Sequence, residues 1–229
     1  AKLLAKRYFD EKGYKNAEIN IIQRDDVTAP DRIIVDIDID KKTKVKINSI
    51  EIVGNHSLST KKIKGTMFTS GVFKKTHEKG RVGNWFKSKK FIDEKYKADK
   101  ENLIAKYNEL GYRDATILGD SVWNVDPKHV NVWIKVEEGQ KYYVRNVQWV
   151  GNTVYNSDLL SHYLSLHKGS VYNQKLMDKR LSTDDDAVSN LYYNNGYVFS
   201  HIDPVEVNVV GDSIDLEMRI YEGPQAHLR

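Results

Sequence analysis

The side chains in this sequence best suited to metal chemistry are histidines in two stretches. His77-Glu78 opens like the metal-binding helix of a zinc protease, but HEKGR has no second histidine four residues on. His162 and His167 are five residues apart, so on a helix they would point about 140° away from each other. That angle is too wide for two imidazoles to share one ion. The histidines therefore predict no metal site.

The remaining candidate for catalysis is the acidic run Asp184-Asp185-Asp186. On the helix expected there, neighbouring carboxylates would point about 100° apart, which is typical of a solvated face rather than of a carboxylate cluster. The sequence also contains no GxSxG, no P-loop and no GxGxxG motif. We therefore expect neither an enzyme nor a cofactor-binding protein.

The composition is that of a globular chain, and it excludes several classes of protein. With 40% hydrophobic and 30% charged residues, the 229-residue chain is too apolar to be disordered. The absence of cysteine excludes disulfides and thiolate metal sites. A net charge of +4 is lower than nucleic-acid-binding domains usually concentrate. No apolar run approaches the roughly 18–20 residues of a membrane-spanning helix. The opening AKLLAKRYFDEKGY lies inside a helical pattern without a signal-peptide pattern, so we expect a fragment of a longer protein.

The elements of the fold follow from an internal repeat. Residues 50–55 read IEIVGN and residues 147–152 read VQWVGN, which is an offset of 97 (151 − 54 = 97). The neighbouring apolar positions match at the same offset without a gap, so a module is duplicated. The glycine of each VGN is expected to take a positive φ. Five residues later, Ser59 and Asn156 are expected to cap a helix.

A second helix follows in each module and ends at a Gly-Tyr pair. Apolar residues at helical spacing predict helices over 93–110 and 174–195. These helices, and the helical pattern at the start of the chain, stop at Gly111-Tyr112, Gly196-Tyr197 and Gly13-Tyr14. Two strands then follow each stop, at about 17–24 and 32–40, 114–124 and 129–137, and 197–209 and 213–221. The last strand ends in Glu-Gly in the second and third copies, and in Lys41-Lys42 in the first.

The repeating unit is therefore β-α-α-β-β, and the fold class is α+β. The expected boundaries are the C-terminal half of a truncated module at 1–42, complete modules at 43–140 and 141–223, and the start of a linker to a further repeat at 224–229. The middle module carries an insert at 69–91 between its helices. The short junctions near residues 42 and 140 suggest restricted hinges rather than free linkers.

This order of elements and motifs resembles the POTRA (polypeptide-transport-associated) domain over nearly the whole chain. The resemblance implies a three-stranded mixed sheet with two helices on one face, the last strand in the middle and the penultimate strand at an edge. Tandem copies are similar to the periplasmic arm of BamA-like outer-membrane assembly factors. The implied partners are nascent outer-membrane β-barrel proteins, accessory lipoproteins and a C-terminal membrane β-barrel of the same protein. A structural spacer, a TamA-type factor and a two-partner-secretion pore are the alternatives.

A small sheet covered by helices on one face leaves edge strands open, and an extended client can pair with such an edge through its backbone. The penultimate strands, 115–123 and 199–209, are the candidate edges. Pro204 removes a donor from the second, so we expect that edge to bind more weakly. The candidate client-binding residues are Ala115, Ile117, Leu118, Val122, Trp123, Phe199, His201, Val205 and Val207.

The insert at 69–91 combines basic and aromatic side chains. Such a patch is typical of contact with an acidic protein partner or an anionic membrane surface, and less so here of nucleic acid. A solvated loop whose aromatic side chains fold back onto the helices is the interpretation that we favour, and contact with a partner protein or a lipid surface is the alternative. The candidate residues are Lys74, Lys75, Lys79, Arg81, Trp85, Phe86, Lys87, Lys89 and Lys90.

Overall fold

The computed structural model describes residues 2–29, 31–65, 71–74, 76–77 and 90–226. The chain divides into two compact units. The first unit comprises residues 1–103 and 117–137, and the second comprises residues 104–116 and 138–229. Each unit contains a three-stranded sheet, and the first unit also contains a two-stranded hairpin. This is the α+β class expected from the repeat.

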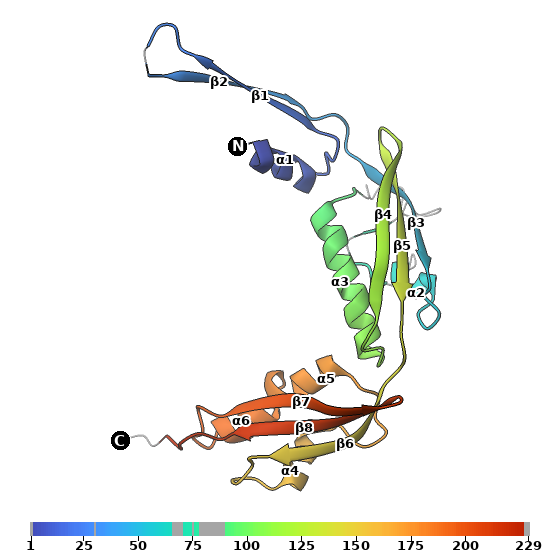
Figure 1. Ribbon diagram of the computed structural model, residues 1–229, viewed down its shortest axis with the longest axis vertical. Helices are drawn as coiled ribbons and strands as arrows, with labels where there is room; N and C mark the ends of the chain where they lie inside the picture. Colours follow the sequence, from blue (N-terminus) through green and yellow to red (C-terminus); the bar gives the residue numbers. More distant parts are fainter. Residues whose placement is uncertain (1, 30, 66–70, 75, 78–89, 227–229) are drawn as a thin grey trace. The chain divides into compact units, whose positions relative to one another are not determined.

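The N-terminal part of the first unit, drawn in blue in Figure 1, is a helix followed by an antiparallel hairpin. It consists of α1 (Lys2–Glu11), β1 (Glu18–Asp25) and β2 (Ile33–Asp40). In β2 aliphatic and acidic residues alternate, and they point to opposite faces because successive side chains of a strand do so. Ile19, opposite Ile39, is buried, whereas most side chains of β2 are exposed.

The sheet of the first unit has the strand order β3-β5-β4. Its strands are β3 (Lys46–Val53), β4 (Thr116–Asp126) and β5 (His129–Glu137). Its helices are α2 (Thr60–Lys64) and the first part of α3 (Asp93–Glu109), whose residues from Ile104 on belong to the second unit. Strand β3 runs parallel to the central strand β5. Every second residue of β5, from Val130 to Val136, is buried, as expected for a strand whose one face is covered.

The second unit repeats this topology with the strand order β6-β8-β7. Its strands are β6 (Tyr143–Val150), β7 (His201–Val210) and β8 (Ser213–Tyr221). Its helical segments are α4 (Ser157–Leu164), α5 (Gln174–Asp178), a π-helical turn η1 (Lys179–Thr183) and α6 (Val188–Tyr193). The core joins β8 residues such as Leu216 to Leu160, Leu164 and Tyr192 from the helices. The expected central position of the last strand is confirmed in both sheets.

The VGN turns have the same construction in both sheets. Gly54 and Gly151 have φ values of +81° and +88°. A Cβ atom at either position would collide with a backbone carbonyl oxygen, that of Val136 or Ile220, in the central strand. The following asparagine, shown by Asn152, donates from its side chain to a carbonyl three residues on, at 2.9 Å. Only glycine fits at this position, since both the dihedral angle and the space exclude a side chain.

The predicted helix caps are confirmed. The Ser59 hydroxyl accepts from the amide of Lys62 at 3.3 Å, and the Asn156 side chain accepts from the amide of Leu159 at 2.8 Å. At the other end, each Gly-Tyr pair closes a Schellman motif. The amide of Tyr112, for example, donates to the carbonyl of Tyr107 at 3.0 Å, and the same bond occurs at Tyr14 and Tyr197.

The glutamate of the last Glu-Gly pair closes a polar contact within its module. The Glu222 carboxylate accepts from the amides of Thr153 and Val154, both at 2.9 Å, and from the Tyr192 hydroxyl at 3.1 Å. In the first copy, Lys42 stands where the other copies have glycine. It nevertheless takes the glycine-like φ of +51°, and its amide donates to the Asp40 carboxylate.

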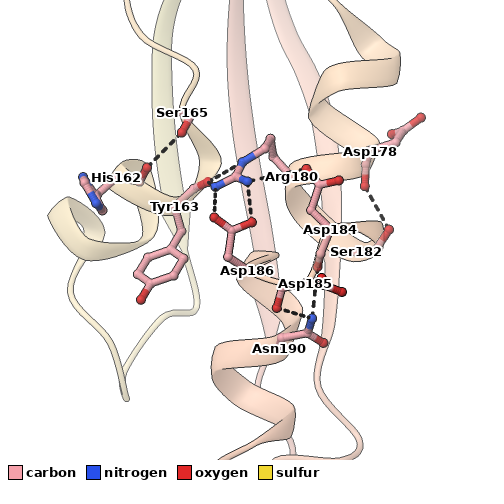
Figure 2. Close-up of polar contacts among 10 residues, drawn as sticks. All are labelled: His162, Tyr163, Ser165, Asp178, Arg180, Ser182, Asp184, Asp185, Asp186 and Asn190. Carbon is pink, nitrogen blue, oxygen red and sulfur yellow. Dashed lines mark hydrogen bonds and ion pairs between the residues drawn. The ribbon is translucent and has the colours of Figure 1, made fainter.

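The prediction of one continuous helix over 174–195 is wrong. The segment divides into α5, η1 and α6, and residues 184–187 between them are not helical. Figure 2 shows the reason: the Arg180 guanidinium donates to the carbonyl oxygen of Tyr163, and to the Asp186 carboxylate at 2.6 Å and 3.1 Å. Asp184 lies 3.5 Å from the same guanidinium. Asp184 and Asp186 are therefore not a solvated helix face, because Arg180 draws them into a polar contact.

Candidate functional site

Strands β4 and β7 lie at the edges of their sheets, as expected for the penultimate strand of each module. The predicted residues of the β4 edge differ in exposure. Leu118 and Trp123 are 53% and 46% exposed, Ile117 and Val122 are half-buried, and Ala115 is buried just before the strand begins. This edge therefore offers exposed apolar side chains, and its outer side has no neighbouring strand among the residues that the structure describes.

The β7 edge is less regular. Phe199 precedes the strand and is 65% exposed, His201 pairs with Tyr221 at the first register position, and Val205 is half-buried. Val207 is exposed and lies at a register shift between Glu206 and Asn208. Pro204 lies inside the strand, opposite Met218. A bulge and a proline are two devices by which proteins blunt a strand edge.

A groove of about 440 Å³ lies between the first half of α3 and β4 in the first unit. Asp120 and Val122 line it from β4, and Tyr96 and Lys100 line it from α3. The Lys100 ammonium lies 2.9 Å from the Asp120 carboxylate and 4.9 Å from the centre of the Tyr96 ring. Burial, together with Asp120, raises the pKa of Tyr96, so this phenol stays neutral at physiological pH.

A polar network lies beside β7 in the second unit. The Arg113 guanidinium binds the Glu206 carboxylate at 2.6 Å and the Asp114 carboxylate at 2.8 Å, and it covers the Tyr142 ring at 4.3 Å. Tyr142 donates its hydroxyl to Asp114 at 2.7 Å, and Tyr172 donates its hydroxyl to Glu206 at 2.6 Å. Hydrogen bonds from Arg113 and then Tyr142 lower the pKa of Asp114. Glu206, in the middle of β7, is thus already bound by Arg113 and Tyr172 of the same chain.

Sequence reasoning missed two further edges. Strands β3 and β6 lie at the opposite side of each sheet from β4 and β7. Each is paired with its central strand through a register shift at an equivalent place, between Ile47 and Ser49 and between Val144 and Asn146. The signal was available, since a three-stranded sheet with its last strand in the middle has two edges.

Of the predicted basic patch, only Lys74 and Lys90 fall on described residues. Lys74 is exposed, and its amide donates to the buried Asp99 carboxylate at 2.8 Å. Lys90 is half-buried and pairs with Lys46 in an isolated antiparallel bridge. The other predicted residues lie outside the described part of the chain, namely Lys75, Lys79, Arg81, Trp85, Phe86, Lys87 and Lys89.

The histidines do not assemble a metal site in the part of the chain that the structure describes. The His77 ring contacts the carbonyl of Lys74 at 3.2 Å, while Glu78 lies outside the described residues. The described residues include no group of three or more histidine, cysteine or carboxylate side chains that could hold a metal ion. The same residues include no helix with the length and apolarity needed to cross a membrane.

Comparison with known proteins gives consistent results. BamA of Neisseria meningitidis serogroup B (strain ATCC BAA-335 / MC58), an outer membrane protein assembly factor, is 26% identical over 87% of this chain and 24% of its own length. A Treponema pallidum (strain Nichols) protein named for outer membrane protein assembly is 21% identical over 97% of this chain and 25% of its own length. This chain therefore spans about a quarter of these curated relatives.

A solved structure has the same fold. The crystal structure of POTRA domains 3–5 of Haemophilus influenzae BamA matches with a TM-score of 0.55 and 21% identity, over 79% of this chain and 67% of that one. The POTRA family model, described as a surface antigen variable number repeat, matches residues 45–139 and 142–223. Since these matches cover most of the sequence, the chain belongs to the POTRA family and carries tandem POTRA domains.

Proposed function

We propose that this chain is part of the periplasmic arm of an outer-membrane protein assembly factor and binds extended segments of nascent outer-membrane β-barrel proteins. The client adds to the open side of β4 as a further strand. Backbone hydrogen bonds supply the affinity, so one edge serves many client sequences. Accessory lipoproteins and the membrane β-barrel of the parent protein are the other partners in this proposal.

The observation that carries the proposal is the placement of β4. It is an edge strand, and a groove runs along it beside α3. Alternate side chains of a client strand point to opposite faces, so one set can enter this groove while the backbone pairs with β4. Exposed Leu118 and Trp123 offer apolar contact to the client. The relatives named for outer membrane protein assembly support this choice of client.

The β7 edge is the weaker of the two sites in this proposal. Pro204 lacks a backbone donor, Val207 lies at a bulge, and Glu206 is engaged by Arg113 and Tyr172. A client strand would therefore find fewer regularly spaced hydrogen-bonding groups there than along β4.

A second candidate function is a structural spacer that holds partners at fixed distances. The Gly111 carbonyl accepts from the Tyr142 amide at 2.9 Å, and Asn173 donates to the Glu109 carbonyl at 3.1 Å, so the second unit has a tightly bonded turn. This observation favours rigidity but does not require binding of a client. A spacer would show no affinity for extended peptides.

NMR titration with a peptide of about ten residues, apolar at every second position as in a barrel strand, separates the two candidates. Amide shifts concentrated along Thr116–Asp126, larger than those along His201–Val210, are expected. A peptide of the same composition with the alternation scrambled is the control. Larger shifts along β7 would reverse the ranking, and no shift along either strand would favour the spacer.

A further inference from the structure

At two places a Gly-Tyr stop, the chain that follows the module and the segment before the next long helix meet through the same backbone bonds, and we call each such place a corner. The first corner lies at Gly13. The Val45 amide donates to the Gly13 carbonyl at 2.9 Å, and the Val45 carbonyl accepts from the Phe91 amide at 2.9 Å. Lys46 and Lys90 form an isolated antiparallel bridge beside these bonds. The corner joins the N-terminal hairpin part to the module that follows it, within the first compact unit.

The second corner, at Gly111, repeats each of these contacts within the second unit. The Tyr142 amide donates to the Gly111 carbonyl, and the Tyr142 carbonyl accepts from the Tyr172 amide, both at 2.9 Å. Tyr143 and Val171 form the isolated bridge. The two corners can therefore be compared position by position, as an internal control.

The two corners differ in three of four equivalent side chains. Four positions of one corner have an equivalent in the other. They are the residue before the glycine, the residue before the amide that donates to it, the second residue of the isolated bridge, and the third residue of the helix that follows. At the Gly13 corner they are Lys12, Lys44, Lys90 and Lys95. At the Gly111 corner they are Leu110, Lys141, Val171 and Leu176. One corner thus carries four lysines where its counterpart carries one.

The segments that carry Lys12, Lys44 and Lys90 meet through the backbone bonds of Val45 to Gly13 and Phe91, and Lys95 lies one helical turn after Phe91. The stem of Lys90 packs on Gly13, where an added Cβ would lie 3.2 Å from the Lys90 Cβ. Contact with Lys44, then burial, then Lys95 and Lys12 lower the pKa of Lys90. Within the described residues no carboxylate forms an ion pair with any of the four; the Lys12 and Lys44 ammonium groups lie instead 5.6 Å and 5.1 Å from the ring centres of Tyr8 and Tyr14. The nearest acids on α3 are engaged elsewhere, Asp93 by Lys15 at 3.1 Å and Glu94 by Arg7 at 2.9 Å.

We propose that the Gly13 corner is a binding site for a phosphate-bearing anion, either inorganic phosphate or the head group of an anionic lipid. The ligands are the ammonium groups of Lys12, Lys44, Lys90 and Lys95, which together offer many N–H donors to the oxygens of a compact phosphate group. A bound anion replaces the mutual repulsion of these charges by attraction to a shared centre. It also ties the hairpin part to the following module, at the junction where Lys41-Lys42 replace Glu-Gly.

The test compares two triple variants with the same loss of charge. Lys12→Gln, Lys90→Gln and Lys95→Gln remove three ammonium groups from the corner. Lys128→Gln, Lys168→Gln and Lys179→Gln remove three exposed ammonium groups elsewhere. Titration of inorganic phosphate, followed by the amide signals of Val45 and Phe91, should show affinity lowered on the order of tenfold in the corner variant only. Equal affinities in both variants would overturn the proposal.

A second set of variants guards against a folding defect. Lys12→Leu, Lys90→Val and Lys95→Leu copy the side chains of the Gly111 corner, so this chain should fold with a higher melting temperature in phosphate-free buffer. Added phosphate should raise the melting temperature of the unmodified protein but not of this variant, and equal increases would contradict the site. In a further experiment the protein is mixed with vesicles of phosphatidylglycerol or of phosphatidylcholine. If it binds only the phosphatidylglycerol vesicles, and the corner substitutions abolish this binding, the natural ligand is a lipid head group. Binding of free phosphate alone would identify a soluble one.

Discussion

The amide of Tyr142 lies 2.9 Å from the carbonyl oxygen of Gly111, and this hydrogen bond has counterparts at both neighbouring repeats. Val45 donates to Gly13 at 2.9 Å and Ala226 donates to Gly196 at 2.8 Å. In every case the donor follows the Glu-Gly position, or its Lys42 equivalent, by three residues. The glycine carbonyl of each Gly-Tyr stop therefore accepts a hydrogen bond from the chain that leaves the same module.

Removing Arg113 should loosen the turn at Gly111. The Arg113→Ala substitution leaves Glu206 and Asp114 without their guanidinium partner, and the network is partly open to solvent, so a loss of about 1 kcal/mol in the free energy of unfolding is expected. Urea unfolding measures it. The control is Arg219→Ala, which removes only an exposed pair with Glu217 and should change stability by less. Equal losses would mean that the network adds nothing beyond a surface pair.

Any substitution of the glycine in the VGN turn should destabilise the fold. Gly151→Ala places a Cβ against the Ile220 carbonyl at a φ of +88°, so a cost of about 3 kcal/mol is expected from collision and strain together. Gly169 has a similar φ of +85° and nothing within 4 Å, so Gly169→Ala should cost only about 1 kcal/mol. Thermal unfolding of the two variants compares them directly. Similar costs would show that the close approach to β8 is unimportant.

The Glu222 carboxylate should make the second unit sensitive to acid. Burial raises the pKa of Glu222, but the hydrogen bonds from Thr153, Val154 and Tyr192 together outweigh it, so the pKa lies below its ordinary value of 4.5. A carboxyl group with a lowered pKa stabilises the fold fully above its ordinary pKa, and this stabilisation is lost as the pH falls through the folded-state value.

Glu222→Gln should therefore lower the free energy of unfolding by about 1 kcal/mol at pH 7. The difference from the unmodified protein should shrink as the pH falls below 4.5, where the carboxyl group itself becomes neutral. Chemical unfolding at a series of pH values between 7 and 3 measures this difference. A difference that stays constant over the series would rule out the ionised state as the source of the stabilisation.

Local chemistry made much of this fold predictable from sequence. The caps at Ser59 and Asn156 and the Gly-Tyr stops depend on residues close together in the chain, and the 97-residue period shows that such local patterns recur. The break in the helix predicted over 174–195 was not predictable in this way. It depends on Arg180 reaching the carbonyl of Tyr163, which is 17 residues away, and such a contact appears only once the module has folded.

The candidate sites also differ in whether they depend on local sequence or on contacts between distant residues. The edge position of β4 follows from the order of elements in the repeat, but the engagement of Glu206 on β7 depends on Arg113, 93 residues away. The Gly13 corner is a stronger example. Lys12, Lys44, Lys90 and Lys95 are ordinary charged residues in sequence, and the backbone bonds of Val45 to Gly13 and Phe91 bring the segments that carry them to one corner.

The most direct test of backbone pairing at β4 is an N-methyl scan of the client peptide, because N-methylation removes one backbone donor and keeps the side chains. Affinity is measured from the amide shifts of Thr116–Asp126. Methyl groups on the peptide edge that faces β4 should each weaken binding about tenfold, and those on the opposite edge should have little effect, so losses alternate with a period of two. Losses spread evenly along the peptide, or absent at every position, would contradict strand addition as the mode of client binding.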